Sequence, residues 1–217
     1  MTTVDPTKNP DEIIEDIEAA EENGDIDQIL AYLEFGSSKD HRGNGDEDED
    51  YAWTEVTEES LDSFYRLVKA GTDPVGPSTA LAYLTKIFSS LEAWKEEEAI
   101  VEVALGCIVS IASKADKTEA AAGEATATAT VAKINLQLQL VLDTMKEFRD
   151  EATIQEQACL AIEGLALWNE DWKATFCESQ GIGKELKAAR EERITNERNK
   201  AYPVRAAKAL GIEFEGP

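Results

Sequence analysis

Residues 154–166 read IQEQACLAIEGLA, and this stretch decides the fold class of the chain. Its residues Ala158, Ala161 and Ile162 lie at positions i, i+3 and i+4, so they share one face of a helix. The same pattern recurs in ALGCI at 104–108 and in AAKAL at 206–210, 54 residues earlier and 48 residues later. Small residues let a neighbouring helix approach closely, and the aliphatic side chain fills the groove, as stacked helical layers require. The pattern predicts an all-α fold built from repeats, with a chance recurrence in an alanine-rich chain as the alternative.

The residues that follow this stretch keep the order of an armadillo repeat. Residues 154–166 resemble the long third helix, and residues 169–180 resemble the short first helix of the next repeat. The segment GIGKEL at 181–186 resembles the Gly-x-Ile-Pro-x-Leu entry to a second helix, and 199–212 resembles another third helix. The chain thus resembles the armadillo/HEAT-like α-solenoid family, most specifically over 151–212. The resemblance implies an armadillo-like right-handed α-solenoid of about ten helices.

The resemblance also implies a mode of binding. Armadillo proteins bind extended peptides or helices along a groove lined by their third helices, and importin-like members use a Trp and an Asn there. The corresponding positions here look like Leu160 and Gly164. Because neither of these positions carries an Asn to pair with a peptide backbone, a different ligand mode is implied. The candidate partner-binding residues are Leu160, Glu163, Gly164, Trp168 and Trp53, the last as an exposed anchor beside an acidic segment.

Helix caps and hydrophobic spacing divide the chain into three segments. Residues 1–35 predict an N-terminal helical hairpin, in which Asp25 caps the second helix. Residues 36–56 predict an acidic flexible loop, because they carry few apolar side chains. Thr57 is expected to cap the helix that follows. Residues 57–217 are expected to form the armadillo-like helical repeat domain, for which the resemblance is weaker before residue 151.

Within that domain the periodicity predicts several helices. The strict alternation NLQLQL at 135–140 is typical of a strand, but its flanks are helical and a lone strand would leave its backbone unpaired. We therefore expect a helix there. Pro203 is expected in the first turn of a terminal helix that begins near Lys200. The expected helices cover about 58–70, 78–93, 96–113 and 133–148.

The charge of the chain is strongly acidic and unevenly distributed. The 217 residues carry 45 acidic and 21 basic side chains, for a formal net charge of −24. This balance argues against binding to nucleic acid or to an anionic membrane, because both require a basic surface. Residues 1–60 hold 20 acidic and three basic residues, whereas 180–217 hold six and eight. The acidic end predicts attraction for a basic partner, with solubility alone as the alternative.

The residues of most catalytic and metal sites are missing from the sequence. His41 is the single histidine, so a histidine-based triad or a histidine-rich metal site is excluded. No phosphate-binding glycine motif is present, and a calcium loop over 40–51 is broken by Arg42 and Tyr51. Three cysteines without a C-x-x-C pair do not predict a disulfide framework. We expect no enzyme activity, no metal and no cofactor.

Three hypotheses for function follow from these observations. The leading one is a non-catalytic scaffold or adaptor that binds a partner peptide or helix on its helical surface. The second is an acidic, chaperone-like or inhibitory module that captures a basic segment. The third is a structural subunit that self-assembles through its terminal helices, which leaves homo-oligomers open. Without a signal-like or spanning segment in the sequence, cytoplasmic residence is expected, with the nucleus as the alternative.

Overall fold

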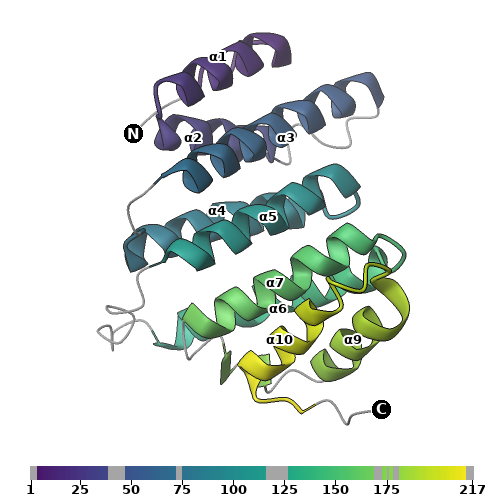
Figure 1. The fold of residues 1–217 in the computed structure, drawn as a ribbon. Helices are drawn as coiled ribbons and strands as arrows, with labels where there is room; N and C mark the ends of the chain where they lie inside the picture. Colours follow the sequence, from purple (N-terminus) through teal and green to yellow (C-terminus); the bar gives the residue numbers. More distant parts are fainter. Residues whose placement is uncertain are drawn as a thin grey trace. The chain divides into compact units, whose positions relative to one another are not determined.

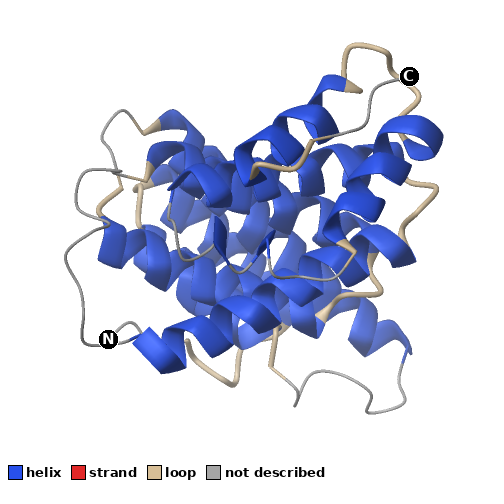
Figure 2. Ribbon diagram, turned by 90° about the horizontal axis from the view of Figure 1, so that it is seen from below, coloured by secondary structure: helices blue, strands red, loops and turns tan. Residues whose placement is uncertain are grey.

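The described part of this protein is helical. Its structure, a computed structural model, describes residues 4–38, 47–71, 75–115, 127–168, 173–174, 176–177 and 181–213. These ranges contain nine α-helices and one π-helical turn, and the β-bridge between Val75 and Ala115 is isolated (Figure 2). The prediction of an all-α protein is therefore confirmed. None of the helices in these ranges is both long enough and apolar enough to cross a membrane.

The chain divides into two compact units. Unit 1 comprises Met1–Asp73 and Ser78–Ile111, and unit 2 comprises Pro74–Pro77 and Ala112–Pro217. The segment boundaries expected from the sequence, after residues 35 and 56, both fall inside unit 1.

Unit 1 begins with the expected helical hairpin, α1 (Pro10–Glu22) and α2 (Ile26–Gly36). Asn9 and Glu12 form a capping box at the start of α1, and Asp25 accepts a hydrogen bond from the backbone N–H of Gln28 at 3.0 Å. The prediction that Asp25 caps the second helix is confirmed. Between the helices, Gly24 adopts φ +69°, which glycine reaches without strain. Isoleucine and leucine side chains of both helices are buried: Ile13, Ile17, Ile29, Leu30 and Leu33.

Helix α3 (Glu47–Ala70) corrects the expected acidic loop. Residues 47–56 are helical, and 39–46 lie outside the described residues. Thr57 therefore does not cap this helix but lies within it, where its hydroxyl donates to the carbonyl of Trp53 at 2.9 Å. Helices α1 and α2 both pack against α3 (Figure 1), and Trp53, Val56 and Thr57 are buried in its N-terminal half.

The remaining helices of unit 1 lie close to their expected positions. Helix α4 spans Pro77–Ala93, and α5 spans Glu98–Lys114, whose last residues belong to unit 2. Leu84, Ile87 and Leu91 are fully buried along α4. Burial of each such side chain contributes about 1.5–3 kcal/mol.

Unit 2 contains α6 (Ala127–Glu147), α7 (Ala152–Trp168), α9 (Ile182–Ala188), the π-helical turn η2 (Ala189–Arg193) and α10 (Ala201–Leu210). The alternating stretch at 135–140 is part of α6, so the choice of a helix over a strand is confirmed. Pro203 lies in the first turn of α10, also as expected. Helices α7 and α10 pack together (Figure 1), and Ala158 and Ala161 of α7 and Ala206 of α10 are buried.

Candidate functional site

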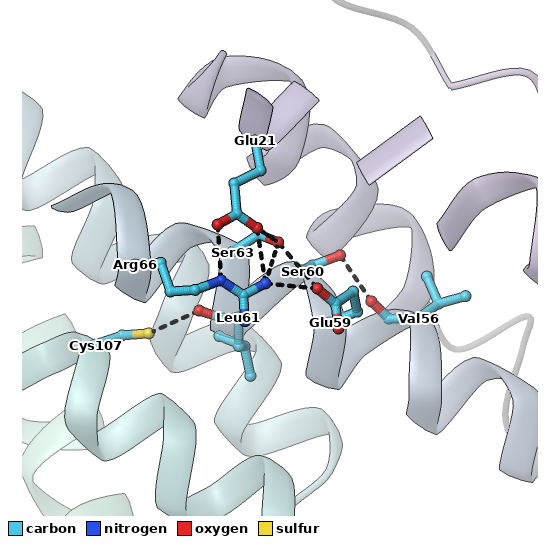
Figure 3. A network of polar contacts seen from close by, with 8 residues as sticks. All are labelled: Glu21, Val56, Glu59, Ser60, Leu61, Ser63, Arg66 and Cys107. Atoms are coloured by element: carbon cyan, nitrogen blue, oxygen red, sulfur yellow. Dashed lines mark hydrogen bonds and ion pairs between the residues drawn. The ribbon is translucent and has the colours of Figure 1, made fainter. Parts of the chain in front are cut away.

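Helix α3 has one buried face and one accessible face. The buried face carries apolar residues and small hydroxyl residues: Trp53, Val56, Thr57, Ser60, Leu61, Phe64 and Val68. The hydroxyl of Ser60 donates to the carbonyl of Val56 at 2.7 Å, so this polar side chain is satisfied inside its own helix. Cys107 of α5 donates its thiol to the carbonyl of Leu61 at 3.4 Å (Figure 3). These contacts fix the rotation of α3 and determine which side chains reach solvent.

A line of tyrosines and carboxylates runs along the accessible side of α3. We call it the α3 stripe and define it by Tyr51, Glu55, Glu58, Asp62 and Tyr65, which follow one another at intervals of three or four residues. Residues at these intervals share one side of a helix. Tyr51 is 66% exposed and Glu55 is exposed, whereas the other three are half-buried. Three carboxylates thus lie between two aromatic rings.

The pKa values of two carboxylates of the α3 stripe, Glu58 and Asp62, are raised. Burial raises the pKa of Glu58, and the neighbouring carboxylate of Asp62 raises it further. Burial also raises the pKa of Asp62, as do Glu59 and Glu21, while Arg66 opposes the change. Neither Glu58 nor Asp62 forms an ion pair in the described part of the chain. Negative charge is therefore held here at a cost in free energy.

Arg66 lies beside the stripe but points to a different pair of carboxylates (Figure 3). Its guanidinium donates to both carboxylate oxygens of Glu21, from Nε and from one terminal nitrogen, each at 2.7 Å. The same terminal nitrogen lies 2.7 Å from Glu59. Ser63 donates to Glu21 at 2.7 Å, which orients that carboxylate. We call these four residues, Glu21, Glu59, Ser63 and Arg66, the Arg66 clamp.

The Arg66 clamp differs electrostatically from the stripe. Hydrogen bonding to Arg66 lowers the pKa of Glu21, and the hydrogen bond from Ser63 acts in the same direction. Glu21 in turn raises the pKa of Arg66, with a smaller effect from Glu59. Bidentate pairing of this kind is among the stronger hydrogen-bonded ion pairs in proteins. The clamp also connects α1 to α3, because Glu21 lies in the last turn of α1.

Four of the five residues expected to bind a partner lie on α7 in unit 2. Leu160 is half-buried, and Glu163 forms an ion pair with Arg205 of α10 at 2.9 Å. Gly164 lies close to α5, since a Cβ atom added there would be 2.9 Å from the Cβ of Ala112. Trp168 is only 5% exposed. The structure places these residues on one helix but directs the tryptophan to the interior.

Trp53 is not an exposed anchor. It is 6% exposed, and its ring meets that of Phe35 edge-to-face with centroids 5.5 Å apart. This interpretation was wrong because the segment around Trp53 is helical and packs on α2. The α3 stripe itself was missed for the same reason. The stripe consists of tyrosine and acidic residues at helical spacing from 51 to 65. This spacing predicts a common helix face only if the helix begins before residue 51.

A second polar network lies inside unit 2. Gln155 is fully buried and donates its side-chain amide to the carbonyls of Met145 and Phe148, at 2.9 Å each. Arg193, from the π-helical turn, donates to the carbonyl of Met145 at 3.0 Å and forms an ion pair with Glu185 at 2.9 Å. These groups satisfy carbonyls at the end of α6, so the network serves the packing of unit 2.

Metal-binding geometry is absent from the residues that the structure places. Nowhere among them do three or more His, Cys, Asp or Glu side chains gather in a group able to hold a metal ion.

Comparisons of the chain with protein-family models, with curated proteins and with solved structures found no match.

Proposed function

We propose that this protein is a non-catalytic interaction module that holds a basic segment of a partner protein along the α3 stripe. The observation that carries the proposal is the pair of half-buried carboxylates, Glu58 and Asp62, which lie outside any ion pair of the described residues. A cation from a partner would offset the cost of holding these charges in place. Capture of a basic segment is thereby favoured over recognition at the groove of α7.

The tyrosines at the two ends of the stripe support the same partner chemistry. Lysine and arginine bind to the faces of aromatic rings as well as to carboxylates. Tyr65 already has the ammonium of Lys69 at 5.0 Å from its ring centroid, so the ring accepts a cation within its own helix. Tyr51, with 66% of its surface exposed, presents a second ring for a partner side chain.

The dimensions of the stripe fit a short extended peptide. From Tyr51 to Tyr65 the stripe runs about 21 Å, at 1.5 Å per helical residue. An extended chain covers that distance in about six or seven residues, and its alternate side chains point the same way about 6.6 Å apart. The stripe presents a group every three or four residues, or about 4.5–6 Å along the helix axis. We therefore expect a partner segment with lysine or arginine at alternate positions.

The architecture that we propose for the module is an armadillo-like right-handed α-solenoid. Two observations support it. Helices α7 and α10 pack on each other and both bury alanines, as stacked repeats require. The start of α9 at Ile182, directly after Gly181 at φ +101°, fits the expected entry to a second helix.

Fluorescence anisotropy tests the proposal with a labelled peptide of about seven residues that carries arginine at alternate positions. The full chain should bind the peptide at low salt and release it as salt rises. The variant E58Q/D62N should lose about tenfold in affinity. The matched control is E15Q/E18Q, which removes two exposed carboxylates from α1 and changes the net charge equally. Equal losses in both variants would show attraction to net charge alone and would overturn the site.

A second candidate function is self-assembly through the C-terminal helix. A shallow groove of about 480 Å³ lies at the end of unit 2, lined by residues that include Val204 and Ile212. Val204 is 39% exposed, and an apolar side chain at the end of a repeat array favours stacking. Light scattering over a range of protein concentrations tests this function. A constant monomer mass would exclude it.

A further inference from the structure

The Arg66 clamp controls a cation that lies within reach of the stripe. Asp62 and Arg66 are four residues apart on α3, the spacing at which a carboxylate and a guanidinium pair on a helix surface. They form no ion pair in the structure, because Arg66 is instead bound to Glu21 and Glu59. Without Glu21, Arg66 keeps Glu59 as a partner, and Asp62 at helical spacing becomes available as a second one.

We propose that Glu21 is a positioning residue for partner binding: it holds Arg66 away from Asp62 and so keeps the α3 stripe open to a basic segment. This inference rests on the proposed function. Released from Glu21, Arg66 pairs with Asp62 and competes with the partner's cation. Because Glu21 belongs to α1, whatever displaces the end of α1 closes the stripe, and the clamp acts as a switch between open and self-paired states.

The side chains of the clamp have the geometry that such a role needs. The two contacts of 2.7 Å between Arg66 and Glu21 form the planar fork that a single carboxylate accepts from arginine. Ser63 is fully buried and holds one oxygen of Glu21 in place. The guanidinium is itself accessible, with 47% of the side chain exposed, so it has room to change partners.

Peptide anisotropy on four variants tests the inference. E21Q should weaken binding of the arginine peptide about fivefold, although Glu21 lies outside the stripe. E18Q, an exposed neighbour on α1 with the same change in charge, should weaken it less than twofold. R66Q should bind at least as tightly as the parent chain, and E21Q/R66Q should bind as R66Q does. This recovery in the double variant is the outcome that a general loss of negative charge does not produce.

Two results would overturn the inference while leaving the proposed function intact. One is an equal effect of E21Q and E18Q in a chain whose parent form binds the peptide. The other is a double variant that binds as weakly as E21Q. Failure of the parent chain and of R66Q to bind the peptide would instead remove the proposed function. If circular dichroism shows that E21Q is unfolded, S63A keeps every charge and loosens Glu21. Weaker binding by S63A then supports the inference, and unchanged binding overturns it.

Discussion

Arg193 donates a hydrogen bond to the side-chain oxygen of Gln155 at 3.1 Å, across 38 positions of sequence and in the interior of unit 2. The side chain of Arg193 is only 8% exposed, and its other contacts are the carboxylate of Glu185 and the carbonyl of Met145. The π-helical turn that carries Arg193 ends α9 and brings the guanidinium to this position. The hydrogen bonds and the ion pair of Arg193 thus connect α6, α7 and the C-terminal helices of unit 2.

Removal of Arg193 should strongly destabilise the protein. R193A removes the buried cation that pairs with Glu185 and donates to the side-chain oxygen of Gln155, and loss of one member of a buried pair costs about 3–5 kcal/mol. Urea unfolding followed by circular dichroism measures the change in the free energy of unfolding. The control is R198A, since the side chain of Arg198 is exposed and should contribute within about 0.5 kcal/mol. Equal stabilities of the two variants would contradict the network.

Two glycines, Gly164 of α7 and Gly106 of α5, should respond oppositely to substitution by alanine. A Cβ atom at Gly164 would lie 2.9 Å from the Cβ of Ala112, so G164A should destabilise by about 1–3 kcal/mol through overpacking. At Gly106 the nearest atom to an added Cβ is a ring carbon of Tyr65 at 3.6 Å, an ordinary contact. G106A should therefore stabilise by up to about 1 kcal/mol, because alanine favours a helix over glycine. Thermal unfolding measures the stability of both variants. A loss of stability in G106A as well as in G164A would show that α5 has no room for a methyl group at Gly106.

Glu58 and Asp62 should each lower the free energy of unfolding as pH rises. Since the folded pKa values of Glu58 and Asp62 are raised, the folded state binds protons more tightly than the unfolded state. The contribution of these two groups to stability is then greatest below their unfolded pKa values, near about 4, and is lost as pH rises through the folded values. The variant E58Q/D62N should melt above the parent chain at pH 7, and this advantage should vanish in acid. A melting temperature of the variant below that of the parent at pH 7 would contradict the pKa directions.

The three cysteines should differ in reactivity. Burial raises the pKa of Cys107 and of Cys159, and both side chains are inaccessible, whereas Cys177 is exposed. A thiol reagent such as dithionitrobenzoate reacts with accessible thiolates. We expect one thiol to react quickly in the native protein and all three in denaturant. The variant C177S should abolish the fast reaction, and its persistence would place a second cysteine at the surface.

Local patterns in the sequence predicted the elements that depend on nearby residues. The cap at Asp25, the helix over 135–140 and the position of Pro203 each follow from the properties of a few adjacent side chains and the backbone groups they satisfy. The start of α3 did not, because an acidic segment with few apolar residues becomes helical here by packing on α1 and α2. That single boundary also determined whether the α3 stripe was recognised.

By itself, the sequence determined an all-α chain with an acidic N-terminal quarter, since helical periodicity and charge are properties of neighbouring residues. The tertiary structure alone decided that Trp53 is buried and that partial burial raises the pKa values of Glu58 and Asp62. It also decided that Arg66 binds Glu21, 45 residues away, instead of its neighbour Asp62 on the same helix. The physical reason is that burial and ion pairing depend on which distant segments come together, and a local pattern does not specify those long-range contacts.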